Sequence, residues 1–484
     1  MQMSKAQRAA VDFIDANRSG LTTLSDSIFY FGEIAMQEYR TSELMASLLE
    51  EHGFKVERGI AGFKTAFLAT YGSGTPVVAL HTEYDANPSN SQRSGVAQPE
   101  EIVPGAPGHC EGHNCNAAVL VSTAIAIRYA MEKHGLPGTL RIFGAPGEEQ
   151  LLSRPYFVRE GFFDDVDVAF HNHVADRFGT DIGVVQCAAM SADFTFRGEA
   201  AHGGGYAWKA RDALDAVVLM DAGMAQYREH MLSTMSANRI ITQGGEQPNV
   251  IPAVAACWWY FRDATAEGAR TLYERAVKIA QGAAMMADCE MTTSIRAASW
   301  PVRLNRTIAE VIQKSAEAIG MPVWTEDEQR FARALQRQAG VPEAGLREKV
   351  EPITTRPMIP AGNDSGDISW KVPMGRLMFP TNVPRTTFHH WTAGAALTTS
   401  IAHKGSVAGA KVLAMSAIAF LEDEALAVSA KETFRDEIGD TVYRTLLAPG
   451  QTPPPEDTNR ALMERFRPEM SKHYLSEAPV FNRV

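Results

Sequence analysis

The sequence predicts an α/β fold: a mixed, largely parallel sheet flanked by helices, with a smaller α/β unit inserted into the chain. The first observation is that apolar, strand-like segments alternate with helical patterns between residues 54 and 173. Such alternation is typical of a sheet with helices on both faces. The second is a change of pattern near Ala192, where strands and helices follow the order βαββαβ of a ferredoxin-like, two-layer unit.

The elements of the first part follow from hydrophobic periodicity. Apolar residues at helical spacing predict helices within residues 5–53, and short apolar runs predict strands. The segment Glu83–Gly105 is rich in Pro, Ser, Asn and Gln, and so long a loop inside a compact domain is usually functional. Further predicted elements are strands at Phe54–Arg58, Lys64–Thr70, Val77–His81, Gly138–Phe143 and Val166–His173, and helices at Ala117–Lys133 and Pro155–Phe163.

The inserted unit is predicted over residues 191–298, because sheet-type signals resume after Pro301. It divides the larger domain into residues 1–190 and 299–484. The second part contains a Gly/Asp loop at Ala361–Trp370, which is expected to run into a strand, and a long helix pattern at Ser400–Leu421. Within the inserted unit, strands are predicted from Ala192, at Asn238–Gln243, Ala255–Arg262 and Glu290–Arg296, and helices at Ala213–Met231 and Gly268–Met286.

Composition limits the partners and the compartment. The formal net charge is -11 with both signs spread along the chain, which disfavours nucleic acids and anionic membranes as partners. No run approaches the ~20 apolar residues of a membrane span, and the N-terminus lacks the pattern of a signal peptide. Five scattered cysteines favour a reducing compartment without a disulfide framework. We therefore expect a cytoplasmic protein.

One loop carries an unusual density of possible metal ligands. Residues 105–114 read GAPGHCEGHN and precede a long helix pattern. Other acidic and imidazole side chains stand at the ends of predicted strands, and the carboxyl ends of parallel strands meet at one edge of a sheet. Mixed carboxylate and imidazole ligands suit Zn²⁺ or Mn²⁺. The candidate residues are Glu83, Asp85, Glu111, His113, Glu148, Glu149, His173 and His389.

Adjacent Glu148 and Glu149 follow an apolar strand and a GAPG turn. One carboxylate can bind a metal while the other acts as a base toward a water molecule that the metal activates. A solvated surface pair is the alternative interpretation, since glutamate is mostly exposed. The strand and the turn before this pair favour the functional interpretation.

In the inserted unit, His202 stands in a Gly-rich turn after a strand, where an imidazole could polarise a carbonyl. Asn249 and Arg262 could hold a substrate carboxylate, since an arginine can donate two hydrogen bonds to one. The residue pattern alone is equally compatible with polar turn residues and a solvated arginine.

Taken together, these motifs resemble the zinc-dependent aminoacylase/carboxypeptidase superfamily, and within it amidohydrolases of the p-aminobenzoyl-glutamate hydrolase type. The likeness covers most of the chain, and each of its motifs would be weak alone. The motifs that carry the likeness are EYDA, the long loop leading to GHCEGHN, GAPGEE, FVREGFFDDVD, FRGEAAH, ALDAV, GGEQPNVIP, DSGDISWKVP, FHHW and SIAHKG.

The resemblance implies a metal-dependent catalytic domain, with the inserted unit as lid and dimer interface. It implies that Glu148 is the general base and that Asp85 bridges or orients the metal site. His202 would polarise the carbonyl, often in the partner subunit's site, and Asn249 and Arg262 would bind substrate. The metal ligands implied by the family are His113, Glu149, His173 and His389, around one or two divalent ions.

The sequence departs from the family at one ligand. Relatives usually read GHxCGHN with the cysteine as a ligand, whereas Glu111 occupies that position here and Cys110 stands one place earlier. We expect Glu111 to replace the thiolate and to favour Zn²⁺ or Mn²⁺ with oxygen ligands. The alternatives are that Cys110 reaches the metal through a changed turn, or that the site is weak or empty.

The expected function is hydrolysis of a C–N bond in an N-acyl or N-aroyl amino acid or a short dipeptide, such as p-aminobenzoyl-glutamate. The expected substrate is a small molecule with a free carboxylate, and the expected assembly is a homodimer or higher homo-oligomer through the inserted unit. Two alternatives remain open: an aminohydrolase acting on a substituted aromatic amine at the same site, or a binding protein on a catalytically retired fold.

Overall fold

The computed structural model describes residues 3–482, so residues 1–2 and 483–484 lie outside the described part of the chain. Its larger sheet has six strands in the order β1-β2-β4-β3-β5-β12. Strands β4, β3, β5 and β12 run parallel, whereas β1 with β2 and β2 with β4 are antiparallel pairs. The predicted mixed, largely parallel sheet is therefore confirmed. The bounds are β1 (Lys55–Arg58), β2 (Phe67–Ser73), β3 (Val77–Thr82), β4 (Gly138–Gly144), β5 (Val168–Ala175) and β12 (Met374–Pro380).

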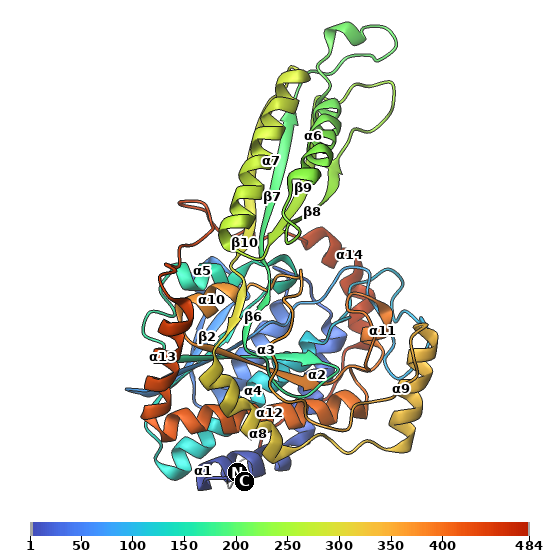
Figure 1. The fold of residues 1–484 in the computed structure, drawn as a ribbon. Helices are drawn as coiled ribbons and strands as arrows, with labels where there is room; N and C mark the ends of the chain where they lie inside the picture. The colour runs from blue at the N-terminus through green and yellow to red at the C-terminus, as the bar shows by residue number, and fades with distance from the viewer. Residues whose placement is uncertain (1–2, 483–484) are drawn as a thin grey trace.

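Helices cover both faces of this sheet (Figure 1). Successive strand residues point to opposite faces, so Leu80 joins the core formed with α4 and α12, and Ala79 joins the core that contains α5. The helices are α1 (Lys5–Ala16), α2 (Arg18–Phe31), α3 (Tyr39–Glu51), α4 (His113–His134), α5 (Ser153–Arg159), α8 (Arg306–Ile319), α9 (Glu326–Gln338), α10 (Gly366–Lys371), α11 (Trp391–Gly394), α12 (Ser400–Glu422), α13 (Glu424–Ile438) and α14 (Arg460–Met470).

The inserted unit projects from the body of the molecule as a tall, narrow block (Figure 1). Its four antiparallel strands have the order β10-β7-β9-β8, and two helices complete the βαββαβ sequence, as predicted. A two-stranded sheet of β6 (Gly183–Gln186) and β11 (Val302–Leu304) lies where the chain enters and leaves the inserted unit. The unit consists of β7 (Ala188–Arg197), α6 (Ala213–Tyr227), β8 (Ser236–Gln243), β9 (Val254–Asp263), α7 (Ala266–Met286) and β10 (Glu290–Ser299).

One local expectation is wrong. Residues 361–370 are not a loop that runs directly into a strand, because helix α10 (Gly366–Lys371) forms their second half and ends before β12 begins. The Asp367 carboxylate accepts a hydrogen bond from the Trp300 backbone N–H at 3.0 Å and another from the Tyr443 hydroxyl at 2.7 Å. These partners are distant in sequence, and a helix this short depends on such tertiary contacts, so periodicity does not reveal it.

Helix α12 is long and mostly buried. It is long and apolar enough to cross a membrane, with a mean hydropathy of 1.4 over 18 residues, which was not expected from the sequence. However, 89% of that stretch is buried inside the protein, so core packing accounts for its composition. Gly405 and Gly409 allow its close approach to β12, because a Cβ on Gly405 would lie 2.0 Å from the Pro380 carbonyl oxygen.

We predict that Gly405→Ala lowers the free energy of unfolding by about 1–3 kcal/mol or more, since backbone cannot yield to an added methyl group as a side chain can. Gly282→Ala is the matched control, because Gly282 is also inside a helix, but a Cβ there would meet nothing within 4 Å in residues 3–482 outside its own helix backbone. It should gain about 0.5–1 kcal/mol. Urea unfolding of both variants checks this; equal effects would contradict the tight α12–β12 contact.

Candidate metal centre

Acidic and imidazole side chains gather where the central parallel strands end. Glu83 and Asp85 follow β3, Glu148 and Glu149 follow β4, and His173 lies within β5. This is the edge at which the carboxyl ends of parallel strands meet. The chain therefore brings together residues that are up to about ninety positions apart in the sequence.

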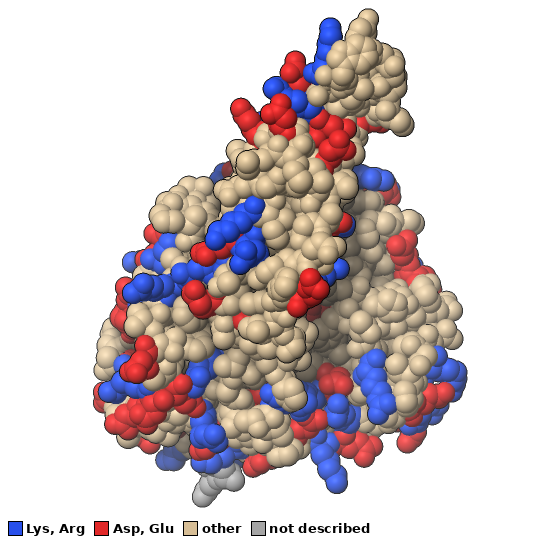
Figure 2. All heavy atoms as spheres, turned by 45° about the horizontal axis from the view of Figure 1, so that its top comes forward, with Lys and Arg blue, Asp and Glu red and all other residues tan. Residues whose placement is uncertain are grey.

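A cavity of about 580 Å³ opens at this edge, a size typical of small-molecule sites. Its walls come from the body and from β9 of the inserted unit, and they combine charged groups with Trp258, Tyr260 and Phe388. Figure 2 shows the recess at the foot of the projecting unit, with acidic and basic residues interspersed over that face. The cavity can therefore receive a small molecule with both apolar and charged parts.

Two glycines position the ligand-bearing turns. Gly112 has φ +128°, and a Cβ there would lie 3.0 Å from the Val174 side chain, so the chain can turn tightly into α4 only with glycine. Gly147 has φ +70° and donates its N–H to the buried Glu38 carboxylate at 2.9 Å. This turn presents Glu148 and Glu149 from a short 3₁₀ segment, Glu148–Gln150.

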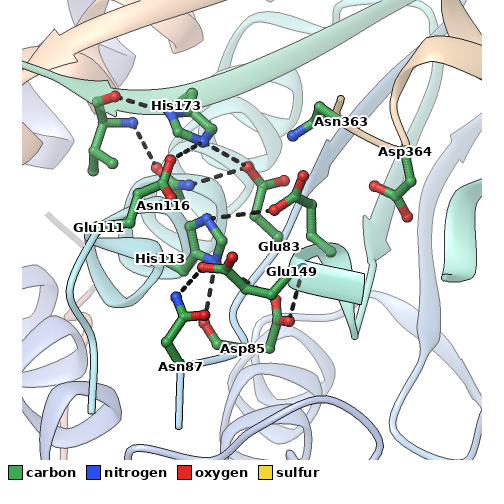
Figure 3. Close-up of polar contacts among 12 residues, drawn as sticks. Glu83, Asp85, Asn87, Glu111, His113, Asn116, Glu149, His173, Asn363 and Asp364 are labelled. Carbon is green, nitrogen blue, oxygen red and sulfur yellow. Dashed lines mark hydrogen bonds and ion pairs between the residues drawn. The ribbon is translucent and has the colours of Figure 1, made fainter. Parts of the chain in front are cut away.

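His113 begins α4 with one ring nitrogen fixed and the other free. Nδ1 donates to the Asp85 carbonyl oxygen at 3.0 Å, and the Asp85 carboxylate lies 3.5 Å from the same nitrogen (Figure 3). Nε2 is buried and has no hydrogen-bond partner within residues 3–482. Asp85 also accepts the Glu149 backbone N–H at 3.1 Å. The structure thus places Asp85 behind His113 and Glu149, where it orients them.

Glu111 lies between two histidines. One carboxylate oxygen is 3.3 Å from His173 Nε2 and the other is 3.2 Å from His389 Nε2. His173 Nδ1 donates to the Val174 carbonyl at 2.9 Å, which leaves Nε2 to face the carboxylate. His389 Nε2 is also 3.0 Å from Glu149. The Glu111 carboxylate therefore lies between His173 and His389, with one oxygen near each ring.

His389 adopts φ 60°, the left-handed region that is strained for a residue with a side chain. Its backbone N–H donates to the Cys110 carbonyl oxygen at 3.2 Å, which holds the strained segment against the loop before α4. Such outliers are frequent at functional sites. The neighbouring His390 contacts the Thr392 hydroxyl at 2.9 Å and takes no part in this cluster.

Glu83 is fully buried behind the histidines. Its carboxylate pairs with Arg154 and lies 3.0 Å from His171 Nε2. It also lies 3.4 Å from His173 Nε2 (Figure 3). Arg154 also pairs with Asp364. The positive charge of Arg154 is therefore shared between Glu83 and Asp364. Arg154 forms no ion pair with Glu111, Glu148 or Glu149 within the described residues.

Three sets of side chains are each close enough to share a cation, with ligand atoms within 4.8 Å of one another. With Nδ1 donating to Asp85, the buried Nε2 of His113 carries a lone pair that has no hydrogen-bond partner among residues 3–482 and that a metal would accept. The nitrogen and carboxylate atoms suit Zn²⁺ or Mn²⁺. The residues therefore fit a divalent metal. The sets are Glu83, His113 and His173; Glu111, Glu149 and His389; and His113, Glu148 and Glu149.

The electrostatics of the cluster reflect crowded carboxylates. Burial raises the pKa of Glu148 well above its usual value, and the negative charges of Glu149 and Glu83 raise it further. Burial would also raise the pKa of Glu111, but contacts with His389 and His173 outweigh it and lower that pKa. Hydrogen bonds that the His389 ring donates to the Glu111 and Glu149 carboxylates raise the pKa of His389 to about 10. Each carboxylate thus depends on a neighbouring positive charge.

Cys110 is fully buried next to this cluster, but it is in none of the three sets. Burial raises the pKa of its thiol, and the nearby charges of Glu149 and Glu111 raise it further. The surroundings of Cys110 therefore disfavour a thiolate.

The residues expected from the inserted unit lie in two places. Arg262, near the foot of β9, lines the cavity and donates to the Asn238 side chain at 3.1 Å. His202 and Asn249 lie together near the far end, where the Gly203 backbone N–H donates to the Asn249 carbonyl at 2.9 Å. They are exposed and do not line the cavity of their own chain.

Two buried arginines were not singled out from the sequence. Arg154 holds Glu83 and Asp364, and Arg376 lines the cavity from β12. The available signal was an arginine beside apolar residues: Arg154 begins the run RPYFV, and Arg376 is the lone charged residue of MGRLMFP. Buried arginine is rare unless it is paired, so both positions deserved a functional hypothesis.

Comparison with known proteins gives consistent results. A family model described as "Peptidase dimerisation domain" matches residues 186–284. The chain is 32% identical over 480 residues to the B-type subunit of p-aminobenzoyl-glutamate hydrolase of Escherichia coli (strain K12), covering 94% of this chain and 100% of the relative. It is 26% identical to Xaa-Arg dipeptidase of Mus musculus, covering 67% and 74% of the two chains.

A solved structure shares the fold. A dinuclear metal-binding peptidase of the M20 family from Bacillus subtilis aligns with TM-score 0.54 and 18% identity, covering 84% of this chain and 99% of that chain. The extent of the match to the Escherichia coli relative shows the family, and the structural match shows the fold. The chain therefore belongs to the M20 family of metal-dependent hydrolases, together with the p-aminobenzoyl-glutamate hydrolase of Escherichia coli.

Proposed function

We propose that this chain hydrolyses the amide bond of an N-acyl or N-aroyl amino acid or a short dipeptide, such as p-aminobenzoyl-glutamate. The observation that carries the proposal is the state of Glu148. Its carboxylate lines the cavity and, within residues 3–482, accepts no side-chain or backbone hydrogen bond, with His113 Nε2 at 3.9 Å as its ion-pair contact. Glu149, beside it, is already engaged by His389 and Asn87. Glu148 is therefore free to handle a proton.

The ligand sets suggest two cation positions joined by Glu111. His113 and His173 would serve one position, Glu149 and His389 the other, and the two Glu111 oxygens would face one position each. When bound, a divalent cation would polarise a substrate carbonyl and lower the pKa of a water molecule. Glu148 would accept a proton from water and pass it to the departing amine, as a general base that becomes a general acid.

The cavity supports the proposed substrate class. Trp258, Tyr260 and Phe388 offer aromatic surface for an acyl or aroyl group, and Arg262 offers a cation for a carboxylate. Relatives of this chain are described as hydrolases of p-aminobenzoyl-glutamate and of Xaa-Arg dipeptides, which release amino acids from amide or peptide bonds.

A release screen tests the proposal. N-acyl and N-aroyl amino acids and short dipeptides are incubated with protein loaded separately with Zn²⁺, Mn²⁺ or Co²⁺, and the free amino acid is quantified. We expect release of an amino acid from at least one carboxylate-bearing substrate. Release of ammonia from aromatic amines, without any amino acid release, would instead favour an aminohydrolase.

We predict that Glu148→Gln lowers kcat by about 10²–10⁴-fold, the usual contribution of a general acid–base group, while metal content and melting temperature stay near those of the unchanged protein. Glu160→Gln, the same chemical change at an exposed residue paired with Arg159, is the control and should keep full activity. An unchanged kcat in Glu148→Gln would contradict the proposed mechanism.

We also propose a homodimer through the inserted unit. Strand β8 lies at the edge of its sheet, and Ile240 and Ile241 on it are 55% and 46% exposed. An unpaired edge strand with exposed apolar residues is suited to pairing with a second copy. The peptidase dimerisation domain match covers the same region. Association with a different chain is the alternative, since the Escherichia coli relative is itself described as one of the subunits of its hydrolase.

His202 would then complete the partner's site. Ala189 on β7 pairs with Arg262 near the cavity, and Arg197 ends the same strand. The distance from Ala189 to Arg197 is about 27 Å at the usual rise of a strand. His202 lies beyond Arg197, so it is too far to serve its own cavity without a large movement. A second copy could bring it near.

Subunit mixing tests this arrangement. We predict that Glu148→Gln and His202→Ala proteins are each nearly inactive, and that dissociating and reassociating an equal mixture restores roughly a quarter of the wild-type activity, because half the dimers then contain one complete site. Mixing two samples of the same variant is the control. No recovery, with heterodimers demonstrated by mass spectrometry, would contradict donation of His202 across the interface.

We further propose a cytoplasmic location. All five cysteines are unpaired, and four of them are buried. Free buried thiols without any disulfide are the usual pattern of proteins in a reducing compartment.

A further inference from the structure

Arg376 is a buried arginine that faces the cavity. It lies on β12, is only 6% exposed and lines the cavity together with Met378 two residues later. Leu377 and Phe379, which alternate with them, pack into the core on the opposite side of the sheet. In the strand register, Arg376 pairs with His171 and Met378 pairs with His173. Arg376 is therefore about 7 Å along the strand from the level of His173.

The guanidinium of Arg376 has no carboxylate partner. Its Nη1 donates to the Gln186 side-chain oxygen, while its Nε is buried without a hydrogen-bond partner, and no ion pair within residues 3–482 includes it. The acid that most favours its charged form is Asp181, followed by Glu83 and Glu148. Asp181 already pairs with Arg177 and Arg356, and Glu83 pairs with Arg154. In contrast, the other deeply buried arginine, Arg154, pairs with two carboxylates.

Arg376 remains charged at neutral pH, because burial lowers its pKa only to about 10. A buried, charged guanidinium without an anionic partner is costly. The group is planar and carries five donors, a geometry that matches a carboxylate through two parallel hydrogen bonds. The open side of Arg376 is the cavity, so its missing partner has to come from a ligand.

We propose that Arg376, held by Gln186, binds a carboxylate of the substrate within the same subunit and thereby sets specificity. This inference depends on the proposed function, since it assigns a binding position within that site. Arg262 is a second cation on another wall, where it lies 4.9 Å from the Tyr260 ring centroid. Two separated cations can distinguish the α-carboxylate of an amino acid from a carboxylate on its side chain.

The test compares three compounds: an N-aroyl-glutamate, the corresponding glutamine derivative, and the glutamate derivative with its α-carboxylate converted to an amide. We measure kcat/KM and, by calorimetry, the dissociation constant of each compound for the wild-type protein and for Arg376→Gln. We expect the wild-type protein to discriminate against one of the two amides by about 10- to 100-fold, the range of charge-assisted hydrogen bonds. The amide that the wild-type protein rejects but Arg376→Gln accepts as well as the acid identifies which carboxylate Arg376 binds.

In Arg376→Gln this discrimination should disappear. The KM and the dissociation constant of the N-aroyl-glutamate should rise, whereas kcat should change less. Arg376→Lys should retain part of the discrimination. Gln186→Met removes the side-chain oxygen that holds Arg376 and should weaken the discrimination. This variant replaces Arg376→Gln in the test if Arg376→Gln does not fold. Arg347→Gln is the matched control, since Arg347 is exposed, pairs with Asp176 and Glu351, and does not line the cavity.

The inference is overturned if Arg376→Gln weakens binding and turnover of all three compounds equally, or changes only kcat. Those results would assign Arg376 to general structure or to the transition state. Failure of the proposed function is a different result: the wild-type protein would release no amino acid from any compound. The dissociation constants would still report on Arg376 in that case, because binding does not require turnover.

Discussion

The crowding of buried carboxylates at one edge of the sheet is the constraint on which the site depends. Glu83, Glu111, Glu148 and Glu149 gather there: the charges of Glu149 and Glu83 raise the pKa of Glu148, and the charge of Glu111 raises the pKa of Glu149. Arg154 offsets part of this charge, but it is shared with Asp364. Burying like charges is unfavourable unless a cation compensates them. A divalent cation at this edge would offset the repulsion between the carboxylates, and its attraction to them would favour metal binding.

The surrounding fold fixes how the ligands face that position. His113 donates a hydrogen bond from one ring nitrogen to the Asp85 carbonyl oxygen, and His173 donates one to the Val174 carbonyl oxygen. The other nitrogen of each ring therefore points toward the cluster. Glu38, out of reach of the cavity, holds the turn that carries Glu148 and Glu149. Such supporting contacts set the tautomer and direction of metal ligands, and they raise metal affinity. The tight turns at Gly112 and Gly147 also fix the direction of the side chains that follow them.

Much of the fold was accessible from the sequence because its signals are local. Hydrophobic periodicity identified the parallel strands and the βαββαβ unit, and the positions of Glu148 and His173 at strand ends followed from them. Helix α10 was missed because Trp300 and Tyr443, distant in the chain, stabilise it. The same reason hid the unpaired state of Arg376, since a strand pattern reveals a buried residue but not whether its partner is present.

The site was accessible to a similar degree. Its acidic and imidazole residues could be predicted from strand ends and motifs. Which of these side chains contact one another could not be predicted. Glu83 was among the candidates, yet its engagement by Arg154 and His171 depends on three segments meeting in space. The position of His202 far from its own cavity depends on the length and direction of β7, which periodicity leaves open.

We propose that Glu111 joins two cation positions and stands where relatives usually have a cysteine ligand. Anomalous diffraction from crystals grown with Mn²⁺ tests it most directly. The account predicts two peaks, one beside His113 and His173 and the other beside Glu149 and His389, with one Glu111 oxygen in contact with each. A peak bound to the Cys110 sulfur, or peaks that Glu111 does not touch, would contradict it.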